Sequence, residues 1–331
     1  MRTRIKLSAM ALLAAGGTAP ALLDAQTAAN AAPASEPAAA PRTSWGDPDL
    51  QGVWDYRTIT PLERRPEFGD RAFYTEEEVA QLEGRAARRM DTPPDPNAPN
   101  TGLVHADYLT DPGRHVDESH RTSLIVDPAT GRMPALTPAA QQRQDAARAA
   151  AESAPPGGKT DSYRDRPLYE RCITRGLAST ILPTLYNNNI RIAQAPGYVA
   201  IVHEMIHETR VVPLDGSPFT GVRSYLGESR GRWEGDTLVI ESRNFNGRAP
   251  FRGAGANLRL TERYRPVNAD RIDFSMTFDD DTQWQQPWAV AYSIRRSDGE
   301  LYEYACHEGN YGLHNILENA RDAERAAAHK H

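Results

Sequence analysis

Alternating apolar and polar residues dominate the second half of the chain and predict short strands there. Tight-turn sequences such as Pro196-Gly197 and Glu234-Gly235-Asp236 separate the apolar runs. The expected strands cover residues 190–195, 198–205, 222–226, 237–242, 258–265, 271–278, 288–296 and 301–305. Short strands joined by tight turns form antiparallel meanders. We therefore expect a mainly β fold whose antiparallel meander closes into a barrel or a sandwich.

Helical signals lie on both sides of this strand-rich region. Thr75 and Glu78 make a capping box for a helix that should run to about residue 89, and Thr137 caps a second, polar helix that should run to about residue 152. Apolar positions at helical spacing between 312 and 328 predict a C-terminal helix that packs on the barrel. We expect a single β-rich domain over residues 45–325, with a helical and loop insertion at about 74–166.

The first residues have the pattern of an export signal. Basic residues at positions 2, 4 and 6 precede an apolar, Ala-rich run over 8–23. That run falls short of the roughly 20 apolar residues that a membrane span needs. Small residues suit cleavage at about 25 or as late as 31, and residues 26–44 are a predicted linker. We therefore expect a signal peptide over 1–25, and a periplasmic or secreted protein with no membrane span.

Charge and cysteine content argue against nucleic-acid binding and against a structural zinc site. The chain has 44 acidic and 38 basic residues, a formal net charge of -6, so it lacks the basic excess of a nucleic-acid-binding protein. Its two cysteines, Cys172 and Cys306, are too few for the common structural zinc sites. In an exported protein an even pair favours one disulfide. The alternative is a reactive thiol at Cys306, which lies beside His307.

Residues 203–207, His-Glu-Met-Ile-His, match a zinc-hydrolase pattern in which two histidines one helical turn apart hold the metal. The flanking residues are mostly β-branched, a turn lies just before them and Pro213 lies just after, so we expect a strand instead. On a strand the two histidines would be roughly 13 Å apart and could not share one ion. We therefore assign no metal ligand and keep a zinc hydrolase as an alternative. The residues expected on one face are Val199, Ile201, His203, Met205 and His207.

Ionisable and amide side chains near the strand ends suggest a polar pocket in the barrel. The expected catalytic residues are His203, His207 and His307, with Glu204 and Glu308 assisting in proton transfer. The expected substrate-binding residues are Tyr186, Asn187, Asn188, Asn189, Arg191, Trp284, Tyr304, Asn310 and Tyr311. Each group also has a structural interpretation, as a polar loop, a disulfide-bearing corner or core.

These residues favour an enzyme that needs no metal or cofactor and performs acid–base chemistry on a small organic or carbohydrate-like molecule. The reaction would be that of a lyase, hydratase, isomerase or hydrolase. The alternative is a non-catalytic barrel protein that binds a small ligand. The oligomeric state and the substrate do not follow from the sequence.

Several longer motifs carry a resemblance. They are Pro48–Trp54, Tyr186–Asn189, Pro196–His207, Ser229–Val239 and Tyr302–Gly312. Together they resemble an uncharacterised family of exported bacterial β-rich proteins, over residues 45–325. The resemblance implies export and a shared β-rich fold, and brings no catalytic residues with it. Gly52-Val53-Trp54 is also similar to the first strand of lipocalin-like barrels, although the insertion at 74–166 departs from a compact lipocalin.

Overall fold

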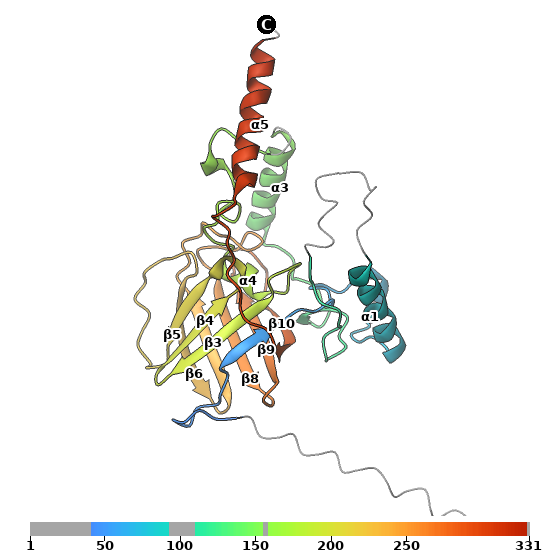
Figure 1. Ribbon diagram of the computed structural model, residues 1–331, viewed down its shortest axis with the longest axis vertical. Coiled ribbons are helices and arrows are strands. Elements are labelled where there is room, and N and C mark those ends of the chain that lie inside the picture. Colours follow the sequence, from blue (N-terminus) through green and yellow to red (C-terminus); the bar gives the residue numbers. More distant parts are fainter. Residues whose placement is uncertain (1–40, 93–109, 155–157, 330–331) are drawn as a thin grey trace, which may run out of the picture. The chain divides into compact units, whose positions relative to one another are not determined.

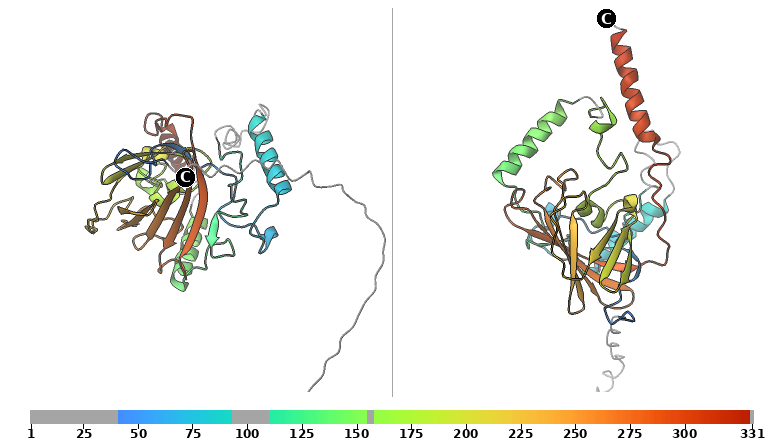
Figure 2. Two further views of the ribbon diagram at one scale, coloured as in Figure 1. Left: turned by 90° about the horizontal axis from the view of Figure 1, so that it is seen from below. Right: turned by 90° about the vertical axis from the view of Figure 1, so that its left-hand side faces the viewer.

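Ten antiparallel strands form one sheet that is nearly closed into a barrel (Figures 1 and 2). The strands are β1 (Gly52–Asp55), β2 (Ile125–Asp127), β3 (Asn189–Ala195), β4 (Tyr198–His203), β5 (Thr209–Pro213), β6 (Glu228–Glu234), β7 (Thr237–Arg243), β8 (Arg259–Pro266), β9 (Arg271–Asp279) and β10 (Trp288–Arg296). Their order is β5-β4-β3-β1-β10-β9-β8-β7-β6, and β2 pairs with β10 outside this path. The predicted mainly β, antiparallel architecture is confirmed.

This computed structural model describes residues 41–92, 110–154 and 158–329. All of them belong to one compact unit, which spans positions 38–331. The predicted signal peptide and residues 26–40 of the predicted linker lie outside the described residues. No helix in the described part of the chain has the length and apolar character needed to cross a membrane.

The two edges of the sheet, β5 and β6, approach each other closely. Gly231 of β6 lies so near β5 that a Cβ atom there would be 2.6 Å from Leu214 Cδ2 and 3.0 Å from Val212 Cγ1. A larger residue at position 231 would push these edges apart. The glycine therefore brings the two ends of the sheet together.

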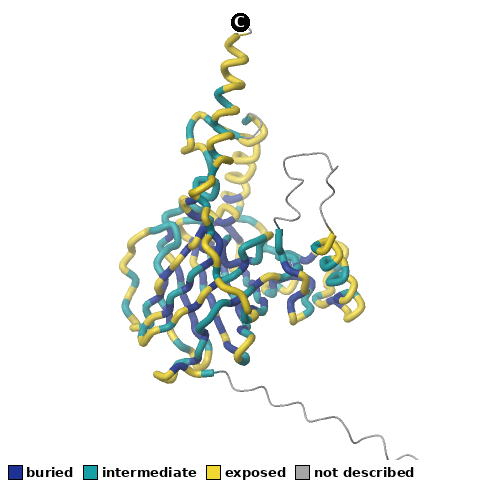
Figure 3. Tube along the Cα trace, in the orientation of Figure 1, coloured by how far each residue is buried: buried dark blue, intermediate teal, exposed yellow. Residues whose placement is uncertain are grey.

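The strands form because one face of each is buried in a shared core (Figure 3). Along β9, buried and half-buried residues alternate without a break, which is the period of a strand with one buried face. The Phe278 and Trp288 rings of neighbouring strands stack with centroids 4.0 Å apart. Trp284 packs on the same two rings. It is therefore a core residue and not the predicted substrate-binding platform.

Four α-helices and three short 3-10 turns accompany the strands in the described residues. They are η1 (Pro66–Phe68), α1 (Glu76–Asp91), α3 (Pro138–Glu152), η2 (Tyr163–Asp165), α4 (Leu177–Ile181), η3 (Met205–His207) and α5 (Tyr311–Ala328). The capping box at Thr75 and Glu78 is present, and the Thr137 side chain accepts a hydrogen bond from Ala140 N. Both predicted helix starts are confirmed.

Three expectations about the fold are wrong. Residues 301–305 form no strand, because β10 already has β9 on one side and β1 and β2 on the other. Residues 222–226 make only one isolated bridge, Ser224 to Phe245, and Val222 is exposed. The helix α5 has no buried residue, so it does not pack on the barrel as expected (Figure 3).

Candidate functional site

The His-Glu-Met-Ile-His segment is neither a zinc-hydrolase helix nor a continuous strand. The strand β4 ends at His203, and the chain turns through η3 before β5 begins. Ile206 and His207 have φ values of 53° and 42°, in the left-handed region that β-branched residues rarely adopt. His203 N donates to Glu208 O across this turn. No group of three or more metal-ligating side chains occurs among the described residues.

The turn separates the two histidines that were expected on one face. His203 points into the barrel and is only 2% exposed, as Val199 and Ile201 of the same strand are buried. His207 is exposed and lines a separate surface pocket of about 420 Å³ with Tyr225. The predicted alternation therefore holds as far as His203 and is wrong beyond it.

His203 lies in the sealed interior of the barrel. Within the described residues neither of its ring nitrogens has a hydrogen-bond partner. It borders a cavity of only about 10 Å³ together with Tyr56, Tyr264 and Tyr292. Burial, and then the positive charge of Arg210, lower the pKa of His203 to about 3. A cavity of this size has room for about one water molecule at most, so His203 cannot meet an organic substrate there.

A buried ion pair occupies another part of the interior. Arg210 of β5 donates two hydrogen bonds to the carboxylate of Glu262 on β8, one of them 2.6 Å long from Nη1 to Oε1. The Tyr264 hydroxyl donates to Glu262 Oε2 at 2.8 Å, and Arg210 Nη1 also reaches Ser242 Oγ. The described barrel interior is therefore filled by its own side chains, and the expected polar pocket does not lie inside it.

Two of the amide residues before and at the start of β3 form hydrogen bonds with neighbouring segments of the chain. Asn188 is buried and its Oδ1 accepts from Thr184 N at 2.7 Å. Asn189 Nδ2 donates to Glu204 Oε2 at 2.8 Å, which holds the turn after β4 against β3. Asn187 has a φ of 54°, and Arg191 is exposed on β3. These residues were expected to bind substrate, and none of them faces a cavity described below.

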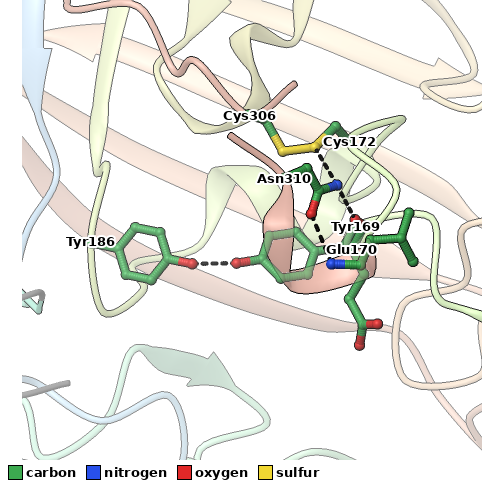
Figure 4. The surroundings of a disulfide bond; sticks show 7 residues. Tyr169, Glu170, Cys172, Tyr186, Cys306 and Asn310 are labelled. Atoms are coloured by element: carbon green, nitrogen blue, oxygen red, sulfur yellow. Dashed lines mark hydrogen bonds between the residues drawn. A yellow bond between two sulfur atoms is a disulfide. The ribbon is translucent and has the colours of Figure 1, made fainter. Parts of the chain in front are cut away.

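The Cys172–Cys306 disulfide is present, and it anchors a second group of predicted residues (Figure 4). Asn310 Nδ2 donates to Glu170 O, and its Oδ1 accepts from Leu313 N at the start of α5. The Tyr186 hydroxyl bonds that of Tyr169, and Tyr304 joins them. Burial and the neighbouring phenols raise the pKa of Tyr186 and of Tyr304.

This cluster holds the C-terminal segment and does not complete a catalytic site. Tyr186, Tyr304 and Asn310 do come together, as expected. However, His307 and Glu308 are exposed in the turn before α5, and Tyr311 is exposed as well. The three predicted catalytic histidines thus lie apart: His203 is in the barrel interior, His207 is in the η3 turn and His307 is in the turn before α5.

Loss of the disulfide should release the C-terminal helix. In the entropic description, closing a loop of 134 residues stabilises the fold by about 4–5 kcal/mol. Because α5 has no buried residue, the C-terminal segment can detach from the folded protein once the disulfide is absent. The detached segment then gains conformational entropy in the folded state, which offsets part of the loss of stability. We expect Cys306→Ser to make residues 301–329 sensitive to protease and to lower barrel stability by less than about 4 kcal/mol. Ser297→Ala is the control and should leave the protease sensitivity of α5 unchanged. If α5 of Cys306→Ser stays as resistant to protease as in the wild type, the expectation is wrong.

A surface cleft of about 1020 Å³ lies between α1 and one end of the barrel. The segment 58–62 and residues 82, 85, 86 and 89 of α1 line one part of it. Residues of α4, the following segment 182–185 and residues 251–252 line the other. Five of its lining residues are arginines, namely Arg65, Arg85, Arg89, Arg175 and Arg252. The remaining lining residues in the described part of the chain are apolar or carry a hydroxyl, and none of these is acidic.

The five arginines have no acidic partner in the part of the chain that the structure describes. Within the described residues none of their side chains forms an ion pair or donates a hydrogen bond, whereas many other arginines do pair with a carboxylate. Arg175 and Arg252 only lie over the rings of Tyr169 and Phe251, with 5.4 Å and 5.8 Å from guanidinium to ring centroid. Arg89 is in the last turn of α1, where the helix dipole stabilises a cation. The dipole does not account for the other four arginines. Unneutralised cations around one concave surface create a positive potential there.

Sequence reasoning missed this cleft entirely. Arg85 and Arg89 are one helical turn apart, which could have pointed to a cationic helix face. The other three arginines are distant in sequence, and only the tertiary fold brings them together.

Comparison with known proteins adds no functional assignment: no family model, no curated protein and no solved structure matches the chain. The resemblance to exported bacterial proteins and to lipocalin-like barrels therefore stays a prediction.

Proposed function

We propose that the protein binds a small organic anion in the cleft between α1 and the barrel. The observation that carries the proposal is the set of five arginines around an apolar cleft, which have no ion-pair partner and no acidic neighbour in the lining among the described residues. Guanidinium groups bind carboxylates, phosphates and sulfonates through charge-assisted, often bidentate hydrogen bonds. The apolar lining, which includes Leu62, Leu182 and Phe251, suits the body of such a ligand.

The size of the cleft supports a small-molecule ligand. Pockets for small molecules and cofactors usually measure about 300–1,000 Å³. The cleft, at about 1020 Å³, lies at the upper end of this range.

Binding without catalysis fits the lining residues better than the acid–base enzyme expected from the sequence. Among the described residues, the side chains that line the cleft include no histidine, cysteine, tyrosine, lysine or carboxylate that could transfer a proton near neutral pH. The proposal thus follows the second expectation, a small-ligand-binding barrel protein, and moves its site from the barrel interior to an outer cleft. The disulfide supports a periplasmic or secreted location for this function.

Two fluorescent dyes that differ by one anionic group test the proposal. Anilinonaphthalene sulfonate carries a sulfonate, and N-phenyl-naphthylamine is its uncharged counterpart. We expect the wild-type protein to bind the sulfonate at least about tenfold more tightly. Because the arginines of the cleft are mostly exposed, added salt should reduce this preference.

Variants of one helix locate the binding. The double variant Arg85→Gln, Arg89→Gln should weaken binding of the sulfonate by about three- to tenfold and leave the neutral dye unaffected. Arg88→Gln is the matched control, because Arg88 is on the same helix and does not line the cleft. Equal affinity for both dyes, or an equal loss in the Arg88 control, would contradict the proposed function.

A further inference from the structure

The two sides of the cleft belong to different parts of the hydrophobic interior. On the α1 side, Tyr74, Val79 and Val116 form a small core cluster of their own, against which Ile59 and Leu82 pack. On the barrel side, Leu124, Leu182 and Phe251 are part of the main barrel core. Ile59 and Leu82, which pack against the small cluster, line the cleft together with Leu124, Leu182 and Phe251 of the main core, so the cleft lies where the two clusters meet.

Each of the two sides carries its own arginines. Arg85 and Arg89 are on α1, and Arg65 precedes η1, close enough to the α1-side cluster for its charge to act on the pKa of Tyr74. These three residues form what we call the α1 wall. Arg175 and Arg252 form the barrel wall.

The barrel wall is fixed to the core of the molecule. Arg175 N donates to the buried carboxylate of Glu208 at 2.6 Å, immediately before α4. Arg252 follows Phe251, whose ring stacks on that of Phe278 with centroids 5.2 Å apart. The arginines of the α1 wall and of the barrel wall therefore come from different segments of the chain, and apolar side chains from both sides line the same cleft.

We infer, on the basis of the proposed function, that the natural ligand carries two anionic groups joined by an apolar body, one group for each wall. A ligand with one anionic group would neutralise one wall and leave the arginines of the other unpaired beside its apolar part. Two anionic groups neutralise both walls and reduce the repulsion between them. The chemical class is that of a long dicarboxylate or an equivalent bis-anion.

Decanedioate and decanoate, which share a carbon chain and differ by one carboxylate, test the inference. Each competes with anilinonaphthalene sulfonate for the wild-type protein. We expect decanedioate to bind about tenfold more tightly than decanoate. In the α1-wall variant Arg85→Gln, Arg89→Gln, and separately in the barrel-wall variant Arg252→Gln, this advantage should fall to about twofold or less. The Arg88→Gln control should keep it.

The outcomes separate the inference from the proposed function. If the two acids bind equally well, or if the advantage of decanedioate survives in either wall variant, the inference is wrong. The preference for the sulfonate dye would then still uphold anion binding in the cleft. If the dye shows no preference for its anionic form, the proposed function fails and the inference fails with it.

Discussion

Replacing Glu262 by Gln should lower the free energy of unfolding by about 3–5 kcal/mol. Glu262 is completely buried and Arg210 nearly so, and their side chains are joined by two hydrogen bonds. Burial favours loss of the charge on Arg210, but the carboxylate of Glu262 outweighs this and keeps the pKa of Arg210 raised. Without that carboxylate the guanidinium is a buried and uncompensated cation. Urea unfolding of wild type and variant measures the difference.

Two comparison variants show whether burial of the charges causes the large loss of stability in Glu262→Gln. Glu241→Gln removes an acidic partner of Arg232 on the surface, where both side chains are about half exposed, and should cost less than about 1 kcal/mol. The double variant Arg210→Met, Glu262→Leu removes both buried charges and should be more stable than Glu262→Gln. A double variant less stable than the single one would show that the pair contributes more than charge compensation.

Wild-type stability should fall by about 2 kcal/mol between pH 7 and pH 5 because of His203 alone. In the unfolded chain this histidine has its ordinary pKa of 6.5, and in the fold its pKa is about 3. Between these values the unfolded state binds a proton that the folded state does not, so stability is lost as the pH falls below about 6.5. The full difference between pKa values corresponds to about 4–5 kcal/mol.

The contribution of His203 is isolated by comparing variants at both pH values. His203→Phe removes the buried imidazole and should remove this part of the pH dependence. His207→Gln is the control, because His207 is exposed and lies in the neighbouring turn. If His203→Phe loses as much stability as the wild type between pH 7 and pH 5, the imidazole is not the buried neutral group described here.

Strands with one buried face were predictable from the sequence. The unbroken alternation in β9 and β10 placed both within one residue of their observed bounds, because each strand buries every second side chain. The segments 222–226 and 301–305 share the composition of strands, but pairing depends on a free sheet edge, which local sequence does not encode. The predicted strand over 198–205 ends at His203, because Ile206 and His207 adopt a left-handed backbone conformation in the turn that follows. Tertiary contacts can override a local strand preference in this way.

The sites were less predictable than the fold. A signal for the buried ion pair exists, because Glu262 lies between Leu260 and Tyr264 on the inward face of β8. The Cys172–Cys306 pairing followed from having only two cysteines. The arginines of the cleft come from the segment before η1, from α1, from the residues before α4 and from the loop after β7. No spacing in the sequence links these positions. His203 and Asn188, two of the expected site residues, are buried in the fold.

A crystal structure of the protein with anilinonaphthalene sulfonate bound is the most direct test of the proposal that the cleft binds organic anions. We predict the dye in the cleft between α1 and the barrel, with its sulfonate within hydrogen-bond distance of at least one of Arg65, Arg85, Arg89, Arg175 and Arg252. A dye bound elsewhere, or a sulfonate that points into solvent away from all five arginines, would contradict the proposal that this cleft recognises organic anions.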